Sequence, residues 1–181
     1  MKTNQTAHGG QRGWTLIETC MVLCTIALVV GITAPSFKAA RERRHLEAAA
    51  AQLHTDLAFA RSLAVARNQP VRMSFARSTT GSCYVVHSGP ADACDCLAGP
   101  APVCTGGAQV FQSGRFSDDK GMVLTASASS MLFDERLGTV TPTSTMHLRS
   151  ASGLEIRKII NILGRVRHCS PAPSMPGYPA C

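Results

Sequence analysis

An apolar run of 21 residues, positions 14–34, constrains this chain more than any other feature. It holds one formal charge, Glu18, and as a helix it would be about 30 Å long, which matches the hydrocarbon core of a bilayer. A basic leader with Lys2 and Arg12 and no acidic residue precedes it. In a secretory signal the apolar segment comes before the cleavage site, but here the small residue Gly13 lies between the leader and the apolar run. This order predicts a protease that cuts on the cytoplasmic side and leaves the helix on the mature protein.

These residues resemble the type IV pilin signature, in which a glycine at the cut is followed by an aromatic residue and then Thr-Leu-Ile-Glu. Here they are Gly13, Trp14 and residues 15–18, with Trp14 in place of the usual phenylalanine, and Pro35 falls where such helices are commonly kinked. The resemblance implies cleavage after Gly13 by a prepilin peptidase and N-methylation of Trp14. A carboxylate inside a membrane segment is costly and is usually paired or functional. The resemblance makes Glu18 an assembly residue that neutralises the freed amine of Trp14 on the same or a neighbouring subunit. The alternative is a plain single-span anchor with Glu18 near the membrane interface.

Beyond Pro35 the helical pattern continues, and the sequence predicts one helix from about Trp14 to Arg67. Small and apolar residues recur at steps of three and four, which predicts one buried stripe. Its members are Leu46, Ala50, Leu53, Leu57, Ala60 and Ala64. Asn68-Gln69-Pro70 ends the helix, and from Val71 the apolar pattern has a period of two, which indicates strands. Six to eight short strands are expected, with an irregular loop over residues 88–107.

A long helix followed by short strands predicts the α+β class, with the stripe packed on a C-terminal antiparallel sheet. We expect a leader over 1–13, a transmembrane and assembly helix over 14–34, a periplasmic part of the helix over 35–69, and a β-rich domain over 70–181. That domain would hold the cysteine-rich loop and a proline-rich tail.

Six cysteines lie in the soluble part, and an even number in an exported domain favours disulfides in an oxidising compartment. They are Cys83, Cys94, Cys96, Cys104, Cys169 and Cys181. Cys94 and Cys96 are poorly placed to bond each other, because one residue separates them. A zinc site that uses His87 has no standard spacing, so disulfides are the favoured interpretation.

The cysteines and the prepilin pattern place the domain in the periplasm and the helix in the inner membrane. The positive-inside rule points the other way, because basic residues cluster after the apolar run. They are Lys38, Arg41, Arg43 and Arg44.

The end of the chain carries the most informative soluble motif. Arg165 and Arg167 flank Val166, so in an extended segment both guanidiniums lie on one side and could clamp a phosphate. Gly164 permits a tight turn that places the pair at the edge of the sheet. Of the adjacent Arg157 and Lys158, the alternation favours Arg157 as the further member of the patch. A disulfide between Cys169 and Cys181 would hold this segment rigid. The alternative without a ligand is a solvated strand end whose arginines form ordinary surface ion pairs.

With the prepilin start and the β-rich domain, this Gly-Arg-x-Arg motif makes the chain resemble the GspH/FimT family of pseudopilins and minor pilins. In the FimT branch the motif is associated with DNA binding during natural transformation, which maps onto Gly164, Arg165 and Arg167. The resemblance implies a non-enzymatic subunit without a cofactor, whose partners are prepilin peptidase, other pilin subunits and DNA. Few aromatic residues are available to stack on bases, so contacts to phosphates would dominate. The alternatives are a GspH-type minor pseudopilin of a type II secretion system and a ligand-free structural minor pilin that primes fibre assembly. The net charge of +7 agrees with an anionic partner but does not identify it. The histidines are scattered and indicate no catalytic site.

Overall fold

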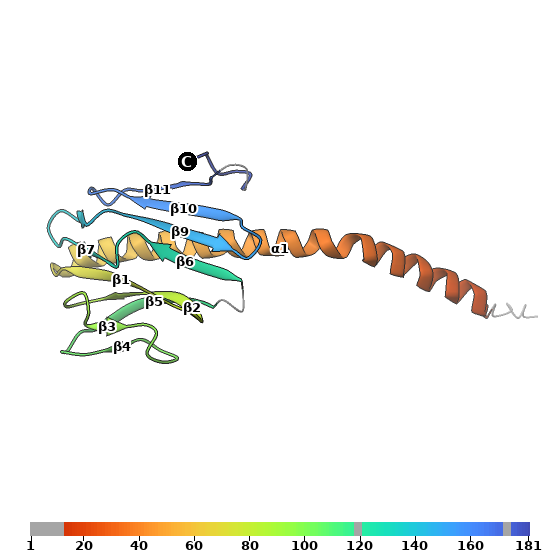
Figure 1. Cartoon of the computed structure of the whole chain (residues 1–181), viewed down its shortest axis with the longest axis horizontal. Helices are drawn as coiled ribbons and strands as arrows, with labels where there is room; N and C mark the ends of the chain where they lie inside the picture. The colour runs from red at the N-terminus through yellow and green to blue at the C-terminus, as the bar shows by residue number, and fades with distance from the viewer. Residues whose placement is uncertain (1–12, 118–120, 172–174) are drawn as a thin grey trace, which may run out of the picture. The chain divides into compact units, whose positions relative to one another are not determined.

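The computed structural model describes residues 13–117, 121–171 and 175–181, without the side chains of residues 33–35. The chain divides into two compact units, Met1–Ala40 and Arg41–Cys181. One helix, α1 (Leu16–Arg67), contributes residues to both units: residues 16–40 belong to the first unit and residues 41–67 to the second. Eleven strands follow it among the described residues, all in the second unit (Figure 1).

In the first unit, α1 begins with a capped turn. Thr15 Oγ1 accepts a hydrogen bond from the backbone N–H of Glu18 at 3.3 Å, which satisfies one of the free donors at the helix start. Glu18 is thus the acidic residue of the first turn, where the positive end of the helix favours a carboxylate. Glu18 therefore also has a local role at the start of the helix, in addition to the one that the pilin resemblance implies. The kink expected at Pro35 falls on residues 33–35, whose side chains lie outside the described part.

The apolar side chains of this first unit are exposed, among them Trp14, Leu16 and Ile32. By length and composition, no single helix in the described part of the chain qualifies as a membrane span. Two consecutive segments of α1, Leu16–Ile32 and Ser36–Arg67, qualify together as a bent pair.

In the second unit, α1 buries the stripe that the sequence predicts. Each of its six members, from Leu46 to Ala64, is at most 1% exposed. The helix ends at Arg67 because Asn68 adopts a left-handed conformation, with φ of 49°, which asparagine tolerates better than most residues. The N–H of Gln69 then donates to the carbonyl of Ala64 at 3.2 Å, which closes the last turn.

Two antiparallel sheets pack on this stripe and share one apolar core with it. The five-stranded sheet has the order β5-β2-β1-β7-β8, with strands β5 (Val110–Ser117), β2 (Gly81–His87), β1 (Val71–Ser78), β7 (Ser130–Phe133) and β8 (Val140–Thr141). The four-stranded sheet has the order β11-β10-β9-β6, with strands β11 (Val166–Cys169), β10 (Glu155–Ile160), β9 (Ser144–Ser150) and β6 (Met122–Ala126). The predicted α+β class, a long helix on antiparallel β-structure, is therefore confirmed.

The cysteine-rich loop is less irregular than the sequence predicts. Residues 88–107 contain two short paired strands, β3 (Cys94–Asp95) and β4 (Val103–Cys104), and the Cys94–Cys104 disulfide joins them. The expectation of a loop without strands was wrong here, because a strand of two residues is too short to show an alternating pattern.

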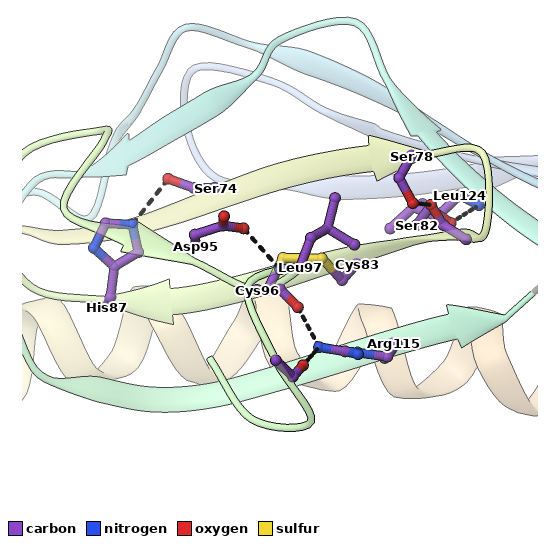
Figure 2. The surroundings of a disulfide bond; sticks show 12 residues. Ser74, Ser78, Ser82, Cys83, His87, Asp95, Cys96, Leu97, Arg115 and Leu124 are labelled. Atoms are coloured by element: carbon purple, nitrogen blue, oxygen red, sulfur yellow. Dashed lines mark hydrogen bonds between the residues drawn. A yellow bond between two sulfur atoms is a disulfide. The ribbon is translucent and has the colours of Figure 1, made fainter. Parts of the chain in front are cut away.

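The other two disulfides fix the loop and the C-terminal tail. Cys83 on β2 is bonded to Cys96, and Cys169 on β11 is bonded to Cys181. Figure 2 shows the carbonyl of Cys96 facing Arg115 of β5, whose Nη2 donates to that oxygen and to the carbonyl of Gly99. The loop is therefore held to the five-stranded sheet by one covalent bond and by hydrogen bonds, among them those from Arg115, Ser74 and Arg72.

Candidate functional site

The hairpin of β10 and β11 carries the basic residues that the sequence singles out. Ile160 pairs with Val166, and the ladder continues one step beyond the strands. There the N–H of Asn161 donates to the carbonyl of Arg165 at 3.2 Å, and the N–H of Arg165 donates to Asn161 Oδ1 at 2.9 Å. Arg165 and Arg167 therefore keep the alternation of β11 and face one side, where both are exposed.

Gly164 fixes this turn against the rest of the domain. Its φ is 73°, a left-handed conformation that favours glycine. An added Cβ would lie 2.9 Å from both Arg61 Nε of α1 and the carbonyl oxygen of Gly138. Those two atoms are themselves hydrogen-bonded at 3.0 Å. The turn before Arg165 is thus packed on a hydrogen bond between α1 and the β7–β8 connection.

We expect Gly164→Ala to lower the free energy of unfolding by about 2 kcal/mol, because it adds a backbone collision to left-handed strain. Gly153→Ala is the matched control, since Gly153 has φ of 88° but nothing within 4 Å of an added Cβ. Gly153→Ala should lower the free energy of unfolding by about 1 kcal/mol, the cost of the left-handed backbone conformation alone. Urea unfolding followed by circular dichroism measures both variants. Equal losses would show that the contact with Arg61 and Gly138 does not matter.

The two neighbours Arg157 and Lys158 lie on opposite faces of the four-stranded sheet. Arg157 pairs with Cys169, and the next residue on the same face, Ile159, pairs with Arg167, so Arg157 lies diagonally beside Arg167. Lys158 faces the core and is 5% exposed, and this burial lowers the pKa of its ammonium group. β11 is the edge strand of its sheet (Figure 1). Arg157, Arg165 and Arg167 make the outer face at this edge basic.

A buried carboxylate, Glu155, lies on the same face of β10 as Arg157 and was missed from the sequence. Its side chain is 4% exposed and accepts hydrogen bonds from three basic groups. They are Arg157 Nε at 2.6 Å, Arg149 Nη2 at 2.6 Å with Nε at 3.1 Å, and His147 Nδ1 at 3.0 Å. Burial alone would raise the pKa of Glu155, but these hydrogen bonds outweigh burial and lower it to about 2.

The sequence did contain a signal for Glu155. Arg149 and Glu155 are direct partners across the β9–β10 hairpin, whose turn contains Gly153. Opposite charges at paired positions are a recognised cross-strand pattern. Recognising this pair requires the register of the β9–β10 hairpin, which cannot be read from the residue types alone.

The hairpin therefore contains two kinds of arginine. Arg157 is half-buried, and its charge is compensated by Glu155. Arg165 and Arg167 are exposed and have no carboxylate partner within residues 13–117, 121–171 and 175–181. Two uncompensated guanidiniums on one rim can bind phosphate or carboxylate oxygens with paired N–H donors.

The predicted N-terminal site belongs to the first unit. Gly13 and Trp14 precede α1 and are exposed, and Glu18 lies in its first turn. Among the predicted site residues, the hairpin thus brings together Arg157, Gly164, Arg165 and Arg167.

Residues 49–164 match a family model described as Type II transport protein GspH, which is more than half of the chain. The matched stretch begins within α1 and ends at Gly164, just before Arg165. No curated protein and no solved structure matches the chain.

Proposed function

The chain belongs to the GspH family, and we propose that this minor pseudopilin binds DNA, without regard to base sequence, through Arg165 and Arg167. Membership of the family makes it a structural subunit rather than an enzyme, with other pilin or pseudopilin subunits as partners. DNA binding in natural transformation, as in the FimT branch, is the more specific role that we infer from the β10–β11 hairpin.

One observation carries the proposal: Arg165 and Arg167 are exposed on one side of an edge strand, without a carboxylate partner in the described residues. An arginine that neutralises a backbone phosphate releases a counterion, so binding is favourable and salt-sensitive. Gly164 supports the pair because it packs the preceding turn on Arg61 and Gly138. Arg157 lies on the same face, but its guanidinium is paired with Glu155.

Phosphates rather than bases are the expected contacts. The ring of His168 makes an edge-to-face contact with Tyr178, with ring centroids 5.3 Å apart, so both rings pack on each other. With these two rings engaged beside β11, the arginines give affinity and orientation but little sequence preference. Weak binding suffices in a fibre, where many subunits act together.

The test is a titration of the full-length protein, in neutral detergent micelles, with a short fluorescent DNA duplex at low salt. Arg165→Ala/Arg167→Ala should weaken binding about tenfold or more, because two phosphate contacts are lost. Arg41→Ala/Arg44→Ala removes the same charge from exposed positions on α1 and should cost less than about threefold. Equal losses in the two double variants, or no binding by the wild type, would contradict the proposal.

A second candidate, favoured by the description of the matched family, is a subunit of a type II secretion pseudopilus that contacts proteins. A third, the ligand-free structural minor pilin, needs no soluble ligand. Both predict that the hairpin arginines do not affect DNA binding, so the same titration separates them from the first.

We also propose that a prepilin peptidase cuts after Gly13, that Trp14 is then N-methylated, and that Glu18 pairs with its amine during assembly. Residues 14–34 would then anchor the subunit in the inner membrane, with the remainder of the chain in the periplasm. The three disulfides of the second unit support an oxidising compartment.

In cells that express a prepilin peptidase, we expect the intact mass of the mature protein to match a chain that begins at Trp14 and carries one methyl group. Gly13→Ala should leave the uncut chain, because the peptidase needs the smallest residue at the cut. Trp14→Phe is the control and should be cut normally. A mature N-terminus elsewhere, or complete cleavage of Gly13→Ala, would contradict this assignment.

A further inference from the structure

A groove of about 400 Å³ lies on the outer face of the four-stranded sheet, where β6 and β9 meet the end of β1. It is lined by Arg77 of β1, by His147 and Arg149 of β9, and by Val123 and Thr125 of β6. Its members are not neighbours in the sequence, because Arg77 is 70 residues or more from His147 and Arg149.

Positive charge in the groove exceeds negative charge. His147 and Arg149 both contact Glu155, and that single carboxylate is shared with Arg157 outside the groove. Arg149 uses Nε and Nη2 for this contact, and its side chain remains 63% exposed. Arg77 is exposed and has no carboxylate partner in the described part of the chain. Among the described residues, the groove is therefore lined by one guanidinium without a carboxylate partner and by a second one that Glu155 holds in place.

We propose that this groove is a phosphate site, in which Arg77 and Arg149 bind the oxygens of one phosphate group. The side chain of Thr125 lines the same groove and can supply a neutral donor. Glu155 acts as a positioning residue, because it accepts hydrogen bonds from Nε and Nη2 of Arg149 and so fixes the guanidinium. A fixed guanidinium loses less conformational entropy on binding than a free one.

The role of the groove in DNA binding rests on the proposed function. If the hairpin binds DNA, the groove extends the protein–DNA contact beyond the edge of the β10–β11 hairpin. The residues that pair with Arg167 in register are Ile159 on β10 and Thr145 on β9, and Arg149 lies four residues further along β9 on the same face. Two strand spacings and four residues place Arg149 and Arg167 roughly 16 Å apart. Duplex DNA carries roughly nine phosphate charges over that length, so one duplex can meet both positions.

The first experiment uses inorganic pyrophosphate, so that its outcome does not depend on DNA. The full-length protein in neutral detergent is labelled with ¹⁵N, and the amide signals of Val123 and Thr125 are followed during the titration. Saturable shifts are expected in the wild type and in Arg165→Ala/Arg167→Ala, and loss of saturation is expected in Arg77→Ala. Arg44→Ala, an exposed arginine on α1, is the control and should behave as the wild type.

The second experiment measures the affinity for the fluorescent duplex. Arg77→Ala should weaken binding about fivefold and reduce the slope of log K against log salt by about one, whereas Arg44→Ala should do neither. Saturation by pyrophosphate without any DNA binding would overturn the proposed function and leave the phosphate site standing.

Absence of saturable shifts with pyrophosphate would overturn the phosphate site, whether or not DNA binds. An oligoglutamate peptide that saturates the same amides at lower concentration than pyrophosphate would also overturn it, and would assign the groove to an acidic protein segment.

Discussion

Replacing Glu155 with glutamine should lower the free energy of unfolding by about 3 kcal/mol at pH 7 and by almost nothing at pH 2. The pKa of Glu155 falls from an ordinary value of 4.5 to about 2 in the folded protein, because hydrogen bonds from His147, Arg157 and Arg149 outweigh the cost of burial. Each pKa unit is worth about 1.4 kcal/mol, which gives the expected size.

The sign of the pH dependence follows from the direction of the shift. A lowered pKa in the folded state means that the stabilisation is fully present above pH 4.5 and is lost as the pH falls toward 2. The difference between wild type and Glu155→Gln should therefore shrink across this window and stay constant above it. In Glu155→Gln the side chains of His147, Arg149 and Arg157 surround a neutral amide. Above pH 4.5 this amide cannot compensate their positive charge as the carboxylate does.

Urea unfolding at a series of pH values from 2 to 7 measures this difference. Glu47→Gln is the control, because Glu47 forms an exposed pair with Arg43 at 3.1 Å and should change stability by less than about 0.5 kcal/mol. A Glu155→Gln protein as stable as the wild type at pH 7, or one with an unchanged pH profile, would show that Glu155 does not organise the face.

The second large effect concerns the disulfide between Cys83 and Cys96. Cys83→Ala/Cys96→Ala should lower the free energy of unfolding by about 3 kcal/mol, the value expected for releasing a loop of this length. The two residues are 13 apart in sequence, and Cys83 is 1% exposed in the core beneath the loop. Amide hydrogen exchange over residues 88–107 should also accelerate, because the loop would lose its covalent bond to β2. The Cys94–Cys104 bond and the hydrogen bonds from Arg115, Ser74 and Arg72 would remain.

The matched control is Cys20→Ala/Cys24→Ala, since these two cysteines are free and exposed in the first unit. It should leave the unfolding of the second unit unchanged. If Cys83→Ala/Cys96→Ala unfolds at the wild-type urea concentration, with unchanged exchange over residues 88–107, this disulfide does not restrain the loop.

Much of the fold was predictable because its elements have strong periodicity. The stripe of α1 repeats over about five turns, so its burial could be read from spacing alone. Strands such as β7 and β9 alternate over at least four residues, so their period of two could be read from the sequence. The strands β3, β4 and β8 have two residues each and depend on a disulfide or a neighbouring strand for their pairing, so they left no pattern.

The positions of the site residues were predictable only where the alternation within a single strand determines which face a side chain is on. The alternation of β10 correctly put Arg157 on the face of Arg167 and Lys158 opposite, although Gly164 interrupts the hairpin. Arg77 was missed because strands distant in the sequence bring it to the groove. Glu155 and His147 were missed because their contact depends on the register of the β9–β10 hairpin. His87, expected among scattered surface histidines, is instead fully buried, and burial lowers its pKa. Its Nε2 lies 2.8 Å from Ser74 Oγ (Figure 2).

The most direct test of the central claim is the salt dependence of DNA affinity for the full-length protein and its Arg165→Ala/Arg167→Ala variant. Each phosphate contact contributes about 0.9 to the slope of log K against log salt, so the variant should lose about two from the magnitude of the wild-type slope. Arg41→Ala/Arg44→Ala should keep the wild-type slope. A wild-type slope retained by Arg165→Ala/Arg167→Ala would contradict the assignment of DNA binding to the β10–β11 hairpin.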